Sequence, residues 1–179
     1  QSIQELNSAQ GYVLVCTIEI LEEFGATVLS GAEIILVSQN PRYAFAQICS
    51  LIYPEQQNNL GAIHPTANIH ASANIPENVT IGPFCCIAAD VSIGQGSSLG
   101  AGIICERSVK IGENCRIADY VTLEKTLIEN GVSIGQHTVI GSPGFGFESS
   151  ENNIQKIPHL GRVLIGDGTS IGAHCCIDR

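Results

Sequence analysis

An aliphatic residue recurs at every sixth position through most of this chain, and this period constrains the fold more than any other feature. No α-helix has a period of six, and a half-buried strand alternates at a period of two. A six-residue repeat is typical of a parallel β-helix, in which each short strand stacks on the strand one coil below at roughly 4.8 Å. The series, in which only Cys105 is not aliphatic, is Ile63, Ile69, Ile75, Ile81, Ile87, Ile93, Leu99, Cys105, Ile111, Ile117, Leu123, Ile128, Ile134, Ile140, Ile165, Ile171 and Ile177.

A second inward position follows four residues after many of these aliphatics, and it holds small or β-branched residues, as a narrow prism requires. A β-sandwich would instead space its turns irregularly, so the sequence predicts a mainly β protein built on a β-helix. Glycine often follows the aliphatic directly, as at Gly82 and Gly94, where we expect a turn to favour its permissive backbone. The small residues are Ala67, Ala73, Val79, Cys85, Val91, Ser97, Val109, Cys115, Val121, Thr138, Thr169 and Cys175.

Composition narrows the function classes. The net charge of −9, with eight scattered Lys and Arg residues, argues against a nucleic-acid partner, because phosphate binding needs clustered basic groups. No apolar run approaches the ~20 residues of a transmembrane helix, so we expect no transmembrane segment. Eight cysteines are present, but several occupy the small inward positions and none forms a CxxC pair, so we expect reduced thiols in a cytoplasmic protein without a zinc site.

Residues 1–57 do not follow the six-residue period and predict a small, partial α/β domain. Strands are expected at Tyr12–Cys16 and Glu33–Ser38, and a helix from Ile18 to Phe24 that ends at Gly25. A second helix should begin at Pro41, with Asn40 as its N-cap, and fade near Pro54. A polar linker at 55–61 then leads into the β-helix, which we assign to residues 58–179.

The repeat is interrupted between Ile140 and Ile165, and we expect an excursion loop over residues 142–160. Loops that leave a regular solenoid commonly carry function. This one contains Phe145 and Phe147, two of only five phenylalanines in the chain, although two aromatics covering a flank of the β-helix would also explain them.

Three strings in and after this interval resemble one enzyme family. They are Gly141-Ser142-x-Gly144-Phe145-Gly146-Phe147, then Lys156-Ile157-Pro158-x-x-Gly161-Arg162-Val163, then Ile177-Asp178-Arg179. Together with Ile63-His64-Pro65-Thr66-Ala67 at the start of the hexads, they are similar to the UDP-3-O-(3-hydroxyacyl)glucosamine N-acyltransferases of the lipid A pathway. The resemblance covers about residues 11–179, and it implies a left-handed β-helix of hexapeptide repeats behind a small α/β domain. Pro143 departs from the family, which usually has an acidic residue there.

The resemblance also implies an activity and partners. The family moves a 3-hydroxyacyl chain from acyl carrier protein to the 2-amino group of a UDP-linked glucosamine, as a homotrimer and with neither metal nor cofactor. A histidine acts as general base, a role that suits imidazole near neutral pH. In the family this histidine follows the Asp-Arg pair by twenty residues or more, and the uracil-stacking aromatics precede the part of the domain seen here. We therefore expect no catalytic residue within the chain, and Phe145, Phe147, Lys156 and Arg162 as substrate-binding residues.

None of the five histidines carries a catalytic assignment from the sequence. His64 and His70 directly follow inward aliphatics and are expected in turns. His137 and His174 occupy the outward fourth position of their hexads, without a carboxylate at an orienting spacing. His159 lies in the loop, where the family often has a different polar residue.

Three other functions compete with this interpretation. The O-acyltransferase of the same pathway, acting on UDP-N-acetylglucosamine, shares the early hexad motifs but lacks the α/β domain and the Gly-Phe-Gly-Phe loop. A γ-class carbonic anhydrase would need three converging zinc-binding histidines. A non-catalytic scaffold, or a truncated paralogue, would explain the missing base but not the preserved loop.

Overall fold

The computed structural model describes residues 11–28, 32–53, 62–151 and 153–179, and the chain divides into two compact units, Gln1–Gln56 and Gln57–Arg179. The polar linker expected at 55–61 lies outside the described residues. No helix among the described residues is long and apolar enough to cross a membrane.

The first unit pairs two parallel strands and carries two helices. Its elements are β1 (Tyr12–Cys16), α2 (Ile18–Val28), β2 (Ala32–Val37) and α3 (Pro41–Ile52). The Oδ1 atom of Asn40 accepts a hydrogen bond from the backbone N–H of Tyr43 at 3.2 Å, so the predicted N-cap is confirmed. The predicted end of the first helix at Gly25 is wrong, because α2 continues to Val28. A single glycine costs a helix only about 1 kcal/mol, which does not by itself end it.

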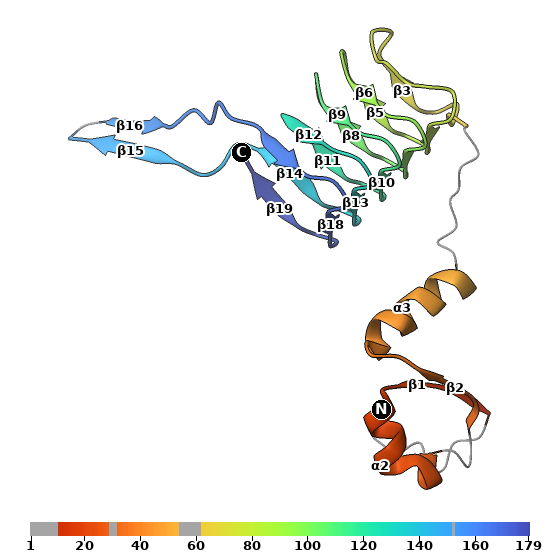
Figure 1. Ribbon diagram of the computed structural model, residues 1–179. Coiled ribbons are helices and arrows are strands. Elements are labelled where there is room, and N and C mark those ends of the chain that lie inside the picture. The colour runs from red at the N-terminus through yellow and green to blue at the C-terminus, as the bar shows by residue number, and fades with distance from the viewer. Residues whose placement is uncertain (1–10, 29–31, 54–61, 152) are drawn as a thin grey trace. The chain divides into compact units, whose positions relative to one another are not determined.

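The second unit is a three-sided prism of parallel sheets (Figure 1), and we name its sides the first, second and third faces. The first face contains β4 (Thr80–Ile81), β7 (Ser98–Leu99), β10 (Arg116–Ile117), β13 (Ser133–Ile134) and β18 (Ser170–Ile171). The second contains β3 (Asn68–Ile69), β5 (Cys86–Ile87), β8 (Ile104–Cys105), β11 (Thr122–Leu123), β14 (Val139–Ser142) and β19 (Cys176–Asp178). The third contains β6 (Ser92–Ile93), β9 (Lys110–Ile111), β12 (Thr126–Ile128) and β17 (Val163–Ile165).

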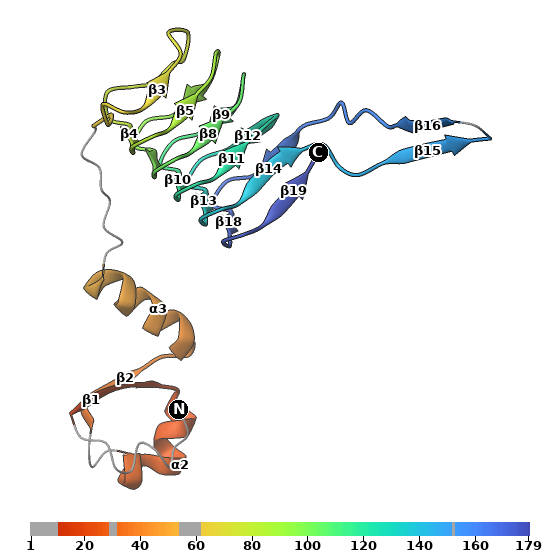
Figure 2. The same cartoon turned by 180° about the vertical axis from the view of Figure 1, so that it is seen from behind.

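Register follows the hexads. Leu99 pairs with both Ile81 and Ile117, each eighteen residues away, so one coil of the prism consists of three hexads. The predicted class is confirmed, and the arrangement of the second unit fits the predicted left-handed β-helix of hexapeptide repeats. The coils stack in sequence order, as both views show (Figure 2).

The inward aliphatics and the small residues between them form one continuous core. Most are less than 5% exposed, including Cys105 at 1% and Leu123 at 0%. The outermost coils are less covered, and Ile63 in the first coil is 48% exposed. All eight cysteines are free thiols, and Cys86 and Cys176 are exposed.

Several glycines that directly follow an aliphatic, among them Gly82 and Gly94, are required by close packing of the coils and not by turn conformation. Gly82 and Gly94 have ordinary φ angles, but a Cβ at Gly82 would lie 2.5 Å from the carbonyl oxygen of Gly100 in the next coil. The expected reason is therefore wrong at Gly82 and Gly94, where close stacking of the coils excludes a side chain, whereas Gly141 after Ile140 does have a positive φ of 88°. Positive φ angles occur two residues after such glycines, as at Phe84 (59°) after Gly82 and Asn114 (53°) after Gly112.

The expected loop over 142–160 is largely an antiparallel hairpin. Strands β15 (Phe147–Ser150) and β16 (Asn153–Lys156) pair from Phe147↔Lys156 to Ser150↔Asn153, and the hairpin extends away from the prism between β14 and β17 (Figure 1). All of their side chains are exposed, so neither strand buries an alternating apolar face, and the sequence did not predict these strands.

Candidate functional site

The hairpin brings three of the four predicted site residues together. Phe147 and Lys156 are direct cross-strand partners, and the ring centroids of Phe145 and Phe147 lie 5.0 Å apart with the rings tilted by 60°. Arg162 is exposed and directly precedes β17, at the end of the segment that leads from Lys156 back to the prism. It forms no ion pair with a described residue. The structure therefore groups Phe145, Phe147 and Lys156, while Arg162 stands apart.

The two rings expose apolar surface to solvent. Phe145 is 94% exposed and Phe147 is 46% exposed, and their tilted contact has the geometry that aromatic pairs prefer. Two adjoining exposed rings beside a lysine suit a ligand that is apolar in one part and anionic in another.

The base of the hairpin is fixed to the prism by Arg179. Its Nη1 atom donates to Oε2 of Glu124 at 2.5 Å and also to the carbonyl oxygen of Gly141. Its Nε atom donates to the carbonyl oxygen of His159 at 3.2 Å. One guanidinium thus joins Glu124 after β11, Gly141 at the start of the excursion and His159 near its end. The sequence analysis assigned no role to Arg179 or Glu124.

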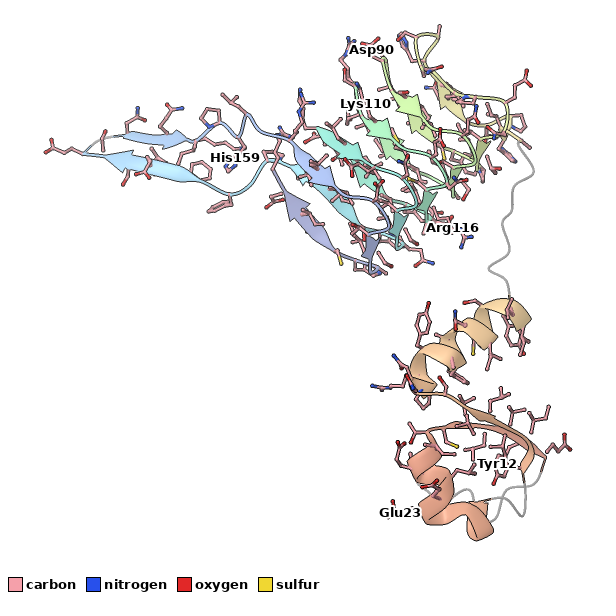
Figure 3. The ribbon with its side chains drawn as sticks, in the orientation of Figure 1. Tyr12, Glu23, Asp90, Lys110, Arg116 and His159 are labelled. Atoms are coloured by element: carbon pink, nitrogen blue, oxygen red, sulfur yellow. The ribbon has the colours of Figure 1, made fainter. Side chains whose placement is uncertain are left out.

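His159 also lies where the hairpin joins the prism (Figure 3), and its ring contacts Arg179 as well. Its Nδ1 atom lies 3.1 Å from the backbone oxygen of Arg179, and since a carbonyl only accepts, Nδ1 carries the proton. Its Nε2 atom is buried and has no hydrogen-bond partner among the described residues.

The glycines of the Gly-Phe-Gly-Phe string make room for that imidazole. A Cβ at Gly144 would lie 2.9 Å from Cε1 of His159, and one at Gly146 would lie 3.3 Å from its Nε2. The ring therefore packs on glycine backbone while the two phenylalanines point outward. The alternation of Gly and Phe was a sequence signal for this packing.

Two other histidines are occupied within their own turns. Nδ1 of His64 lies 2.9 Å from Oγ1 of Thr66, and Nδ1 of His70 lies 3.0 Å from Oγ of Ser72. Among the described residues, no group of three or more His, Cys, Asp and Glu side chains could hold a metal ion.

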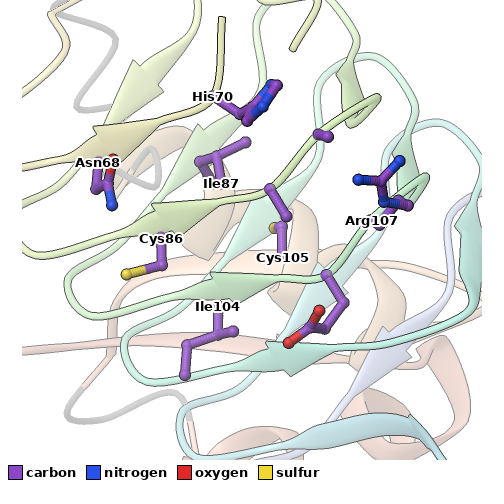
Figure 4. Close-up of a pocket in the computed structure, with 10 residues that line it drawn as sticks. Asn68, His70, Cys86, Ile87, Ile104, Cys105 and Arg107 are labelled. Atoms are coloured by element: carbon purple, nitrogen blue, oxygen red, sulfur yellow. The ribbon is translucent and has the colours of Figure 1, made fainter. Parts of the chain in front are cut away.

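A cleft of about 420 Å³ lies on the second face and the corner after it (Figure 4). It lies over β3, β5 and β8, toward the opposite end of the prism from the hairpin (Figure 1). Cys86 and Ile104 line its floor, with His70 and Arg107 at the corner. Arg107 forms a 3.4 Å ion pair with Asp90, in which both side chains are more than half exposed. None of the predicted site residues lines this cleft.

Comparison with known proteins gives no match to any protein-family model. The chain is 40% identical over 146 residues to UDP-3-O-acylglucosamine N-acyltransferase of Coxiella burnetii, a match that covers 80% of the chain and 42% of that protein. It is 32% identical over 191 residues to the protein of the same name from Polynucleobacter asymbioticus, with 98% and 52% covered. The chain thus spans about half the length of the curated relatives that it matches.

Solved structures give weaker likenesses. The acetyltransferase domain of PglB from Neisseria gonorrhoeae is 16% identical, with a TM-score of 0.44 over 93% of this chain and 87% of that one. PerB from Caulobacter crescentus, in complex with CoA and GDP-perosamine, is 20% identical with a TM-score of 0.43, over 95% of this chain and 87% of that one.

Proposed function

We propose that the chain forms part of a UDP-3-O-acylglucosamine N-acyltransferase of lipid A biosynthesis, because it is homologous to about half the length of proteins with this name. The reaction would transfer a 3-hydroxyacyl chain from acyl carrier protein to the 2-amino group of UDP-3-O-acylglucosamine. The observation that carries the proposal is the 40% identity over 146 residues, which includes most of the β-helix.

The chemistry needs a base and a binding surface. The amine nitrogen attacks the thioester carbon of the donor, an amide bond forms, the C–S bond breaks, and the amine proton passes to a general base. The Nδ1 atoms of His64 and His70 are each occupied by a turn hydroxyl, and Nε2 of His159 is buried. The rings of His137 and His174 are exposed and have no hydrogen bond to an orienting carboxylate among the described residues. We therefore propose that the base is not among the histidines of this chain.

The hairpin would supply binding. We propose that Phe145 and Phe147 contact the acyl chain or acylated sugar, and that Lys156 and Arg162 attract the pyrophosphate or the acidic carrier protein. The net charge of −9 opposes acidic partners at long range, but physiological salt screens it beyond roughly 8 Å, so nearby basic groups decide the local attraction.

We also propose a homotrimer in the cytoplasm. The second face carries an outward row that includes exposed Cys86 and Ile104, which a neighbouring subunit could cover, and the free thiols suit a reducing compartment. Equilibrium ultracentrifugation should show a trimer at micromolar concentration, and a stable monomer would contradict this assembly.

An acyl-transfer assay tests the function. The 179-residue chain should bind 3-hydroxyacyl carrier protein and give no N-acylated product by mass spectrometry. The same chain, extended before Gln1 and after Arg179 with the corresponding segments of the C. burnetii relative, should give product. Normal turnover by the chain alone would show that its own residues include the base. A folded fusion that neither binds the donor nor forms product would contradict the proposed activity.

A further inference from the structure

Three aromatic rings stack along one corner of the prism, between its first and second faces. The ring centroids of Tyr120 and His137 lie 5.1 Å apart, and those of His137 and His174 lie 4.9 Å apart, with the second pair inclined by only 11°. The three residues share a left-handed backbone, with φ of 58°, 58° and 56°, so their side chains leave the corner in the same direction.

The two histidines are neighbours only because of the fold. They lie 37 positions apart in the sequence, whereas stacked residues in adjacent coils are normally 18 positions apart. The hairpin accounts for the difference, and the coils on either side of it stack in register, with Ser133 opposite Ser170. The backbone N–H of His174 donates to the carbonyl oxygen of Gln136 at 2.8 Å, which fixes the two turns against each other. The sequence predicted no metal ligands, because this pairing cannot be seen without the register.

We propose that His137 and His174 together form a binding site for a late transition-metal ion of the Ni²⁺, Cu²⁺ or Zn²⁺ class. Imidazole nitrogen is a preferred ligand for these ions, and both rings are exposed to solvent. The ring nitrogens of His137 and His174 form no hydrogen bond with a described residue, whereas Nδ1 of His64, His70 and His159 each has a hydrogen-bond partner. Adjacent coils place two unengaged imidazoles side by side, which is the elementary requirement for a bidentate site.

Binding requires a small rearrangement that exposure permits. A metal–nitrogen bond is about 2.1 Å long, so the two parallel rings must turn toward one another about their side-chain torsions. Water would fill the remaining coordination positions, since no third protein ligand stands within this cluster among the described residues. A bound ion would then link the coil before the hairpin to the coil after it and stabilise the folded state by mass action.

Nickel titration of the chain by isothermal calorimetry, with its thiols kept reduced, tests the site. Asparagine is the suitable replacement, because it tolerates positive φ and leaves the turn intact. The chain should bind Ni²⁺ at a single site and gain thermal stability on binding. His137→Asn and His174→Asn should each lose both effects, while their melting temperatures without metal stay near that of the unmodified chain.

Matched variants exclude other ligands. His64→Asn and His70→Asn each remove another exposed histidine and should leave nickel binding unchanged. Cys176→Ser removes the exposed thiol two residues from His174 and should also leave it unchanged. Binding that persists in both His137→Asn and His174→Asn, or that disappears in Cys176→Ser, would overturn the proposal.

Discussion

Arg179 and Glu124 form an ion pair with 2.5 Å between Nη1 and Oε2, although 55 residues separate them in the chain. The side chains are only 14% and 36% exposed, so water screens this pair less than a surface pair. We expect Glu124→Gln to lower the free energy of unfolding by about 1–2 kcal/mol, between the values typical of exposed and of buried pairs. Urea denaturation measures the change. Arg107→Gln, which breaks the exposed 3.4 Å pair with Asp90, is the matched control and should change stability by less than about 0.5 kcal/mol.

Ser97 is a buried hydroxyl that serves two backbone groups of the next coil. Its Oγ atom donates to the carbonyl oxygen of Gly112 at 2.7 Å and accepts from the N–H of Cys115 at 2.9 Å. Ser97→Ala leaves both groups without that partner, and we expect it to cost about 1–3 kcal/mol in chemical denaturation. Ser98→Ala, on the outward side of β7, should have little effect. Equal losses in the two variants would show that the hydroxyl of Ser97 contributes nothing specific.

Cys105 is 1% exposed, and burial raises the pKa of its thiol from 9.0 to about 12, with nearby Cys85 adding to the shift. Above pH 9 the unfolded thiol loses its proton while the folded thiol retains it, so the unfolded state binds fewer protons. Stability should therefore fall as pH rises from about 9 to about 12. Cys105→Val should flatten this part of a stability–pH profile measured by thermal unfolding. An unchanged slope in the variant would mean that other groups govern the alkaline loss.

Lys156 should act on binding through its charge. Lys156→Ala should weaken binding of 3-hydroxyacyl carrier protein, and the loss should be larger at low salt than at high salt because ions screen the attraction. Fluorescence anisotropy of labelled carrier protein over a salt series measures it. Lys110→Ala removes an exposed lysine from the third face and should change binding less. A salt-independent loss would assign Lys156 a packing role.

Phe145 should act through apolar contact instead. Phe145→Ala removes a ring that is 94% exposed, so we expect little change in melting temperature and a loss of carrier-protein affinity that varies little with salt. Phe84→Ala, at a corner of the prism and 69% exposed, is the control for removing an exposed ring. If Phe145→Ala lowers only the melting temperature, the hairpin is a structural flap.

The sequence predicted the prism well because the side chain at every sixth position is buried, and this burial appears in the sequence as a regular series of aliphatic residues. Ile81, Ile93 and Leu99 are all at most 2% exposed, as their spacing indicates. The hairpin has no such periodic pattern, because its strands pair through the backbone and all of their side chains, including those of Phe147 and Ile154, are exposed.

Contacts that depend on register were equally hidden from sequence reasoning. The approach of His159 to Gly144 and the stacking of His137 on His174 follow from how the coils align on either side of the excursion. A one-dimensional spacing cannot give that alignment, because the number of residues in the excursion is not a whole number of hexads.

The excursion between β14 and β17 leaves the pairing of β12 with β17 intact, since Thr126 still faces Val163 and Ile128 still faces Ile165, and the register shifts only where the excursion begins, between Ile140 and Ser142. The backbone ladders join each strand of the prism only to the strands directly above and below it, so a change in chain length at a corner does not shift the register of the more distant coils. The corners are accordingly natural points for insertion. A foreign peptide of similar length could be grafted where the backbone already turns outward. It would be displayed on a scaffold that is stabilised mainly by the buried core of the prism.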